Sequence, residues 1–243
     1  MMPRGPTWLV LAICLVLHVT PCAASRENVS EFISILEETG FTVQEGRLGK
    51  LNVLELCSAG YVNYCFGNNA GFPYAIYILP PSIGQDPSPR QAPPIGYDPD
   101  AADNYPANLD TVPAGMTYKL RPDEAIVLIG NTPPPARYFS FRSYLGFVEN
   151  KPGKDYTGTP TFGDDEIGWY HRMYCSLGDP LNHLNMWTSN TPGGAAGNAF
   201  GSATVLITTA DRGMNRMMRD ALTAAGYSPD IINDDNIPPS LVH

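Results

Sequence analysis

The sequence has few of the residues that build metal and nucleotide sites. It contains 4 histidines and 5 cysteines among 243 residues. No Cys-x-x-Cys pair or close histidine pair of the kind that holds zinc is present. No glycine-rich phosphate loop or dinucleotide fingerprint follows an expected strand. We therefore expect no metal site and no cofactor.

Recognisable nucleophile motifs are also missing. Ser58 follows Leu56-Cys57 and precedes Ala59-Gly60, so this stretch lacks the first glycine of a Gly-x-Ser-x-Gly elbow. An extracellular hydrolase would have to use His171 or His183, the two internal histidines of the mature chain, as its base. We keep this hydrolase as an alternative hypothesis, in which the catalytic residues are unknown.

Basic residues are outnumbered by acidic ones. Lys and Arg total 15 against 24 Asp and Glu, which gives a net charge of −9. An acidic chain repels phosphate backbones and anionic membrane surfaces, so nucleic acid is not an expected partner. The acidic clusters at 164–166 and 230–235 lack the alternating Asp spacing of a calcium loop, and we expect them to be ordinary loops.

Long apolar runs are absent after the N-terminal leader. Arg4 precedes an apolar run from Trp8 to Val19, which is broken by Pro21 and followed by Cys22-Ala23-Ala24. The run is shorter than the roughly 20 residues of a membrane-spanning helix. This pattern predicts a signal peptide over 1–24 that is removed by cleavage. The mature chain, 25–243, is then secreted to the extracellular space (or the periplasm in a bacterium), with no membrane span.

Three cysteines remain after this cleavage. In an oxidising compartment Cys57 and Cys65 are the natural disulfide pair, and Cys175 is either buried or paired with one of them. Asn28-Val29-Ser30 is a glycosylation sequon. Asn28 is equally well placed as a helix N-cap, because Glu31 follows it at the capping-box spacing.

The apolar pattern predicts two helices that frame many short strands. Val29 to Thr39 has a helical stripe that ends at Gly40. The C-terminal amphipathic helix starts after Asp211 and closes at Gly226. Its apolar stripe consists of Met214, Met217, Met218, Ala221, Leu222 and Ala225.

Strand-like segments make up most of the regular secondary structure predicted outside the two helices. They are predicted at Tyr74–Leu79, Ala125–Ile129, Arg137–Leu145, Trp169–Leu177, His183–Thr188 and Ala203–Thr208. We expect Arg137–Leu145 to return beside Ala125–Ile129 after the Pro133-Pro134-Pro135 connection. The last segment, Asp230 to His243, is expected to make one edge pairing or to leave the sheet without a final strand.

These elements predict the α+β class, with a mostly antiparallel sheet in a loop- and Pro-rich chain. The segment 80–106 holds eight prolines, which exclude a helix interior or a central strand. We interpret it as a long surface loop inside a single domain over 25–243. A boundary between two subdomains is the alternative.

Two of the predicted strands carry Tyr and Arg together on their less apolar faces. Side chains alternate along a strand, so the sets that share a face are Tyr138, Arg142 and Tyr144 in one strand and Tyr170, Arg172 and Tyr174 in the other. If the strands are neighbours, two arginines framed by four tyrosines form a surface able to hold a carboxylate, a sulfate or a sugar ring. Ordinary cross-strand packing is the alternative.

The sequence therefore favours a ligand-binding or interaction module. Its expected partner is an anionic or saccharide small ligand, or another extracellular protein. A surface or matrix protein that contacts its neighbours through the Pro-rich segment is a further hypothesis.

Overall fold

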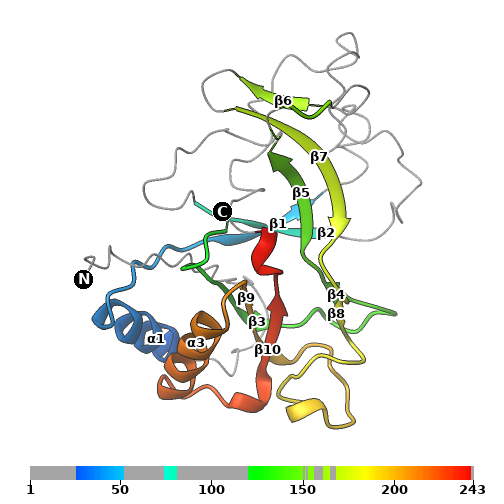
Figure 1. The fold of residues 1–243 in the computed structure, drawn as a ribbon. Helices are drawn as coiled ribbons and strands as arrows, with labels where there is room; N and C mark the ends of the chain where they lie inside the picture. Colours follow the sequence, from blue (N-terminus) through cyan, green and yellow to red (C-terminus); the bar gives the residue numbers. More distant parts are fainter. Residues whose placement is uncertain are drawn as a thin grey trace. The chain divides into compact units, whose positions relative to one another are not determined.

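The computed structural model describes residues 26–51, 74–80, 120–149, 151, 153–155, 161–164 and 168–241. The chain divides into two compact units (Figure 1). Unit 1 consists of Met1–Leu48, Lys119–Ser143 and Ser176–His243, and unit 2 consists of Gly49–Tyr118 and Tyr144–Cys175.

Unit 1 contains a three-stranded mixed sheet. Its order is β10-β9-β3, with bounds Ile232–Asn236 for β10, Ala203–Thr209 for β9 and Ile126–Asn131 for β3. β9 is antiparallel to β3 and parallel to β10. A helix connects β9 to β10, as a parallel pair requires. Within the described ranges β10 is an edge strand, which confirms the expected single edge pairing of the last segment.

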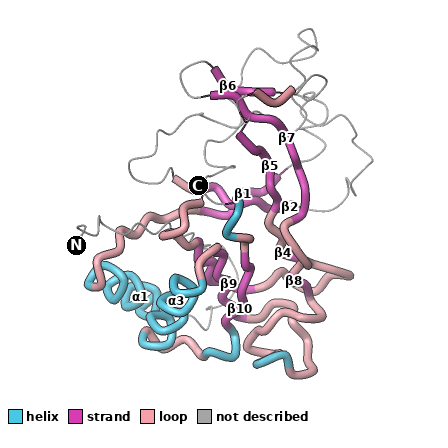
Figure 2. Tube along the Cα trace, in the orientation of Figure 1, coloured by secondary structure: helices cyan, strands magenta, loops and turns pink. Residues whose placement is uncertain are grey.

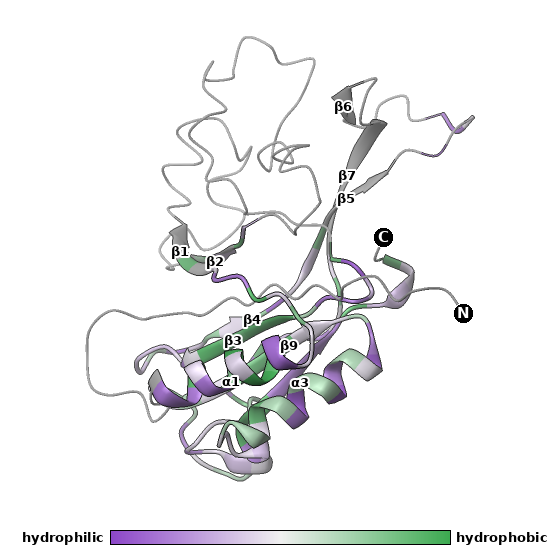
Figure 3. Ribbon diagram, turned by 90° about the vertical axis from the view of Figure 1, so that its left-hand side faces the viewer, coloured by the Kyte–Doolittle hydropathy of each residue, from purple (hydrophilic) through white to green (hydrophobic). Residues whose placement is uncertain are grey.

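In the described part of the chain, the helices α1 (Arg26–Glu38) and α3 (Arg212–Ala224) lie side by side and cover one face of this sheet (Figure 2). Their inward side chains and those of the strands form one buried apolar cluster, which includes Phe32, Leu36, Val205, Ile207, Met218 and Leu222. Hydrophobic and hydrophilic patches alternate along α3, whereas β3 is hydrophobic (Figure 3). These elements belong to the α+β class, as the sequence predicts.

The sequence located α3 well because both of its ends carry local signals. The Asp211 carboxylate accepts a hydrogen bond from the backbone N–H of Met214 at 2.7 Å, which caps the first turn. Gly226 has a φ of +90°, a backbone conformation that favours glycine at a helix end. The buried stripe is narrower than predicted, since Met217 is 45% exposed.

The predicted N-terminal helix is confirmed, but the N-cap interpretation of Asn28 is wrong. α1 begins at Arg26, so Asn28 lies inside its first turn. Glu27 also lies in that turn, where a negative side chain complements the positive end of the helix dipole. The helix therefore starts before the capping-box pair.

The predicted hairpin between 125–129 and 137–145 is also wrong. β3 pairs with β9, and the ladder continues where the N–H of Thr132 donates to the carbonyl of Ser202 at 2.9 Å. Prolines 133–135 have no N–H to donate, so they end the strand without turning it back on itself. The following segment forms β4 (Ser140–Phe141), which pairs with β8 (Leu181–Asn182), and β5 (Tyr144–Glu149).

The strand predicted over His183–Thr188 is replaced by a turn. The Asn182 side-chain oxygen accepts from the N–H of Leu184 at 2.8 Å, and the Asn185 side-chain oxygen accepts from the N–H of Asn182 at 2.6 Å. Asparagine side chains that bond to nearby backbone in this way compete with strand pairing. The apolar pattern did not reveal this local competition.

Two further groups of strands complete the described architecture. β1 (Arg47–Leu51) pairs with β2 (Tyr74–Ile78). A three-stranded sheet has the order β5-β7-β6, in which β6 (Thr161–Asp164) and β7 (Gly168–Ser176) are antiparallel. The strands predicted near 74–79, 169–177 and 203–208 are thus confirmed. Short 3-10 turns occur at Pro192–Gly194, Pro229–Ile231 and Pro239–Leu241.

Several predictions lie outside the described residues. They are the signal peptide over 1–24, the disulfide pair Cys57 and Cys65, and most of the Pro-rich loop over 80–106. Cys175 is in β7, but its side chain is not among those described. In the ranges that the structure describes, no helix has both the length and the apolar character needed to cross a bilayer.

Candidate functional site

A cavity of about 310 Å³ lies at the end of the unit 1 sheet where β3 finishes and β9 begins. Gly130 from β3 and Ala203 and Thr204 from β9 line it. The side chains of Ala203 and Thr204 are almost completely buried, so this wall belongs to the sheet itself. Small side chains at these strand ends are the local reason that space remains.

Two loops and a helix line the cavity around the strand ends. Ser189 and Pro192 come from the segment before β9, and residues 226–228 with Ile231 come from the connection between α3 and β10. Asn28 reaches it from α1. A Cβ atom placed on Gly226 would lie 3.3 Å from Nδ2 of Asn28, so glycine permits the close approach of α1 and this turn. The sequon residue is therefore part of the wall.

Hydroxyl and amide groups, rather than charges, provide the polar part of the lining. The polar residues of the lining are Asn28, Ser189, Thr204, Tyr227 and Ser228. The Oγ atoms of Ser189 and Ser202 are 2.8 Å apart, and the Thr204 hydroxyl donates to the Trp187 carbonyl at 2.9 Å. The Ser228 hydroxyl accepts from the N–H of Asp230 at 3.3 Å. Among the residues that the structure describes, the lining includes no Asp, Glu, Lys, Arg or His.

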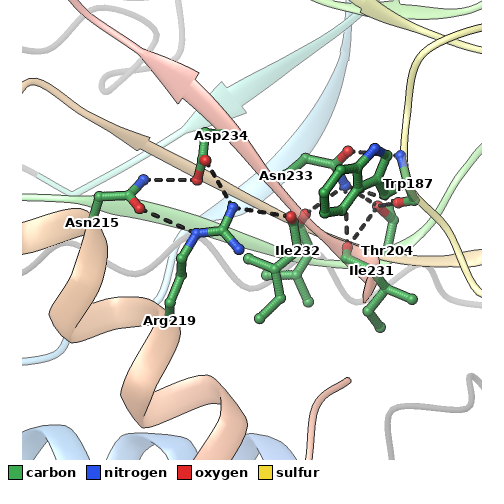
Figure 4. Close-up of polar contacts among 9 residues, drawn as sticks. Trp187, Thr204, Asn215, Arg219, Ile231, Ile232, Asn233 and Asp234 are labelled. Atoms are coloured by element: carbon green, nitrogen blue, oxygen red, sulfur yellow. Dashed lines mark hydrogen bonds and ion pairs between the residues drawn. The ribbon is translucent and has the colours of Figure 1, made fainter. Parts of the chain in front are cut away.

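A buried asparagine fixes the loop that forms one wall. Asn233 of β10 is 5% exposed, and its side-chain oxygen accepts from the N–H of Trp187 at 2.8 Å (Figure 4). Its amide nitrogen lies 2.8 Å from the Trp187 carbonyl and 3.0 Å from the Thr204 hydroxyl. These contacts join the loop to β9 and to the edge strand β10, so these two strands set the wall.

The same loop is braced from within. The hydroxyls of Thr188 and Thr191 are 2.9 Å apart, and both side chains are buried. A Cβ atom on Gly197 would lie only 2.2 Å from the Asn190 carbonyl oxygen, so this position requires glycine. The loop is therefore a packed structure with one defined shape.

A second polar group in Figure 4 has a structural role. Arg219 of α3 lies 2.7 Å from the Asp234 carboxylate and donates to the Ile232 carbonyl at 3.1 Å. Asn215, one turn earlier, donates to Asp234 at 2.8 Å. Both charged side chains are partly exposed, and their contacts tie α3 to β10.

Of the predicted Tyr/Arg face, side chains are described only in the segment 138–144. The single strand predicted there is not found, because Tyr138 and Arg142 lie outside β4 and β5. Tyr138 and Tyr144 are 47% and 48% exposed and Arg142 is exposed, whereas Phe139 is 7% exposed. This agrees with the predicted alternation. Tyr138 and Arg142 belong to unit 1, and Tyr144 belongs to unit 2. The side chains of Tyr170, Arg172 and Tyr174 in β7, also of unit 2, are not among those described, so the six-residue patch remains a prediction.

Of the two candidate histidines of the hydrolase hypothesis, only His183 has a described side chain. His183 packs among aromatic rings, with its ring centroid 5.5 Å from Tyr138 and 5.6 Å from Phe200. Its Nδ1 atom is buried. His171 lies in β7, and its side chain is outside those described. Within the described residues, no group of three or more His, Cys, Asp or Glu is arranged to hold a metal ion.

Sequence reasoning missed the cavity because its residues come from five distant segments. The turn-rich stretch 191–201 and the helix end at Gly226 were recognised as loops, but nothing in their composition indicates a common site. The abundance of Ser, Thr and Asn between 188 and 204 was the available signal. Comparison with family models, curated proteins and solved structures found no match, so the geometry is the basis for the proposals below.

Proposed function

We propose that this protein is a secreted ligand-binding module and that Tyr138 and Arg142, in unit 1, belong to its contact surface. The observation that supports this is the regular alternation from Tyr138 to Tyr144, in which these aromatic and basic side chains are exposed and Phe139 is buried. Tyr144, Tyr170, Arg172 and Tyr174, all in unit 2, are further candidate contact residues of this proposal.

The inward side chains of this segment support a preformed surface. The Phe139 ring packs against Phe200 with a centroid distance of 5.1 Å and an edge-to-face angle of 82°. The Ser143 hydroxyl donates to the Asp235 carboxylate. A backbone held at both points loses little conformational entropy when a ligand binds, which favours affinity.

The side chains that face outward suit an anionic or saccharide ligand. A guanidinium offers paired N–H donors that match a carboxylate or sulfate, and tyrosine rings stack on the C–H face of a sugar. Since the chain carries a net charge of −9, a productive anion contact needs such a local cation. Acidic or sulfated sugars combine both features.

Calorimetric titration with glucuronate, N-acetylglucosamine 6-sulfate and their neutral parent sugars tests the proposal. We expect Arg142→Ala to weaken binding of the charged sugars roughly ten- to hundredfold, because a charge-assisted hydrogen-bonded pair contributes about 1.5–3 kcal/mol. Arg137→Ala is the matched control, since it removes the same charge from an exposed position in the same segment. Equal affinities for wild type and Arg142→Ala, or no binding of either charged sugar, would contradict the proposal.

A further inference from the structure

We propose that the cavity at the end of the unit 1 sheet is a second binding site, for a small neutral molecule that carries hydroxyl or amide groups, about the size of one sugar ring. This site differs from the Tyr/Arg surface, because neither Tyr138 nor Arg142, which belong to the same unit, lines the cavity. It concerns a different ligand class from the charged sugars proposed above.

The chemistry of the lining selects against charged ligands. A charged group taken out of water needs an opposite charge or several strong hydrogen bonds, and none of the described residues that line the cavity is charged. Neutral hydroxyls and amides can exchange their water hydrogen bonds for bonds to serine, threonine and asparagine side chains without this penalty. The polar groups therefore match a polyol or an acetamido sugar.

The hydroxyls keep hydrogen-bonding capacity after their contacts within the protein are made. The Ser228 oxygen accepts one bond from the N–H of Asp230, so its own proton is available to a ligand. Ser189 bonds to Ser202 and accepts from the N–H of Ala203, and a hydroxyl can make a third bond. A ligand hydroxyl can thus bond to either wall of the cavity.

Apolar surface and size complete the match. Pro192, Ala203 and Ile231 add apolar residues to the lining. Sugar rings present a C–H face that packs on such surfaces. Ligand pockets in proteins start at roughly 300 Å³, so a cavity of about 310 Å³ accommodates one ring rather than an oligosaccharide.

The walls are already fixed before a ligand enters. Asn233 holds the backbone of Trp187 through both its N–H and its carbonyl, and the buried Thr188 and Thr191 hydroxyls close the next turn. Gly197 seats the rest of the loop against Asn190. A preorganised wall reduces the entropic cost of binding, which matters most for a small ligand.

An amide-resolved NMR titration of the purified protein tests this site. The probes are methyl α-D-glucopyranoside and N-acetylglucosamine at up to about 50 mM, which detects a millimolar dissociation constant, with glucuronate as the charged comparison. We expect saturable shifts at the amides of Gly130, Gly226 and Tyr227 with at least one neutral probe and none there with glucuronate. Absence of shifts at these amides with both neutral probes would overturn the proposal.

Variants separate this site from the Tyr/Arg surface. Ala203→Val fills the cavity from β9 and should abolish the shifts, and Ser228→Ala should weaken binding at least threefold even if the first variant folds poorly. Ser176→Ala, an exposed serine outside the lining, and Arg142→Ala should bind the neutral probe as wild type does. A separate cavity site would be contradicted if Arg142→Ala lost binding of the neutral probe, or if Ser228→Ala bound the neutral probe with wild-type affinity. Either result would leave the Tyr/Arg surface to be tested by the charged-sugar titration.

Discussion

The two faces of the unit 1 sheet are stabilised by different forces. On the helix side, Val205 and Ile207 of β9 pack against Met218 and Leu222 of α3, and all four side chains are buried. On the other side, Thr204 and Thr208 alternate with them along β9 and bond to β10 residues, Thr204 to Asn233 and Thr208 to Asp235. The helix face buries apolar side chains only, whereas the other face, called the polar face below, combines these hydrogen-bonded threonines with buried apolar side chains such as Leu206 and Leu128.

This difference assigns different tasks to the two faces. Apolar packing is roughly proportional to the buried area and has little directionality, so it stabilises the unit without fixing one loop in one place. Hydrogen bonds require particular distances and angles. The hydrogen bonds of the polar face therefore position the loop that lines the cavity, while the helix face contributes stability through buried apolar area.

The largest expected effect comes from breaking the helix face. Leu222→Ala removes a completely buried side chain from the apolar cluster. We expect the free energy of unfolding to fall by about 2–5 kcal/mol, which is the usual cost of a leucine-to-alanine cavity. Urea unfolding followed by circular dichroism measures it.

Met217→Ala is the matched control on the same helix. Met217 is 45% exposed, so its truncation should change the free energy of unfolding by less than about 0.5 kcal/mol. Equal losses in the two variants would show that α3 does not pack through the stripe that contains Leu222.

A smaller but more local effect is expected from the polar face. Asn233→Leu keeps the side-chain volume and removes the bonds to Trp187 and to the Thr204 hydroxyl. Buried polar groups left without partners cost about 1–3 kcal/mol, so we expect a loss of stability in that range. The fluorescence of Trp187, which is 37% exposed, should shift to longer wavelength as the loop detaches.

Asn236→Leu is the comparison for that variant, because Asn236 is exposed on the same strand. It should leave both the stability and the emission spectrum unchanged within error. If Asn233→Leu lowers stability without any change in Trp187 emission, the asparagine stabilises the sheet but does not position the loop.

The same contrast explains how much of the fold the sequence could predict. α3 was predicted with its cap because periodicity and Asp211 are local signals. β9 was predicted because it is continuously apolar or Thr-containing. The pairing of β3 with β9 was missed, since it joins Ile126 to Thr208 across a long stretch of chain and depends on which distant strand competes best.

The candidate sites follow the same rule. The exposed alternation at Tyr138, Arg142 and Tyr144 was predictable, because it needs only the period of a strand. The cavity was not, because Asn28, Gly130, Ser189 and Gly226 meet only after tertiary folding. The role of Asn233 was hidden for the same reason: in sequence it lies in an acidic segment that was interpreted as a loop.

The smallest expected effect concerns the ionic contact at the rim of the helix face. Arg219 and Asp234 are 2.7 Å apart, but their side chains are 28% and 33% exposed. A double-mutant cycle of Arg219→Gln and Asp234→Asn should give a coupling energy of about 0.2–1 kcal/mol, because solvent screens such pairs. The double-mutant cycle is needed because Arg219 also bonds to Asn215 and to the Ile232 carbonyl. The loss of these two bonds has the same effect whether or not Asp234 is also substituted, so it does not contribute to the coupling energy.

Repeating the cycle in 1 M salt, where the screening length falls to about 3 Å, should reduce the coupling energy further. A larger coupling energy that does not depend on salt would show that the Arg219–Asp234 pair stabilises the fold as the buried contacts of Asn233 do. The contrast between the two faces would then not explain how β10 is attached.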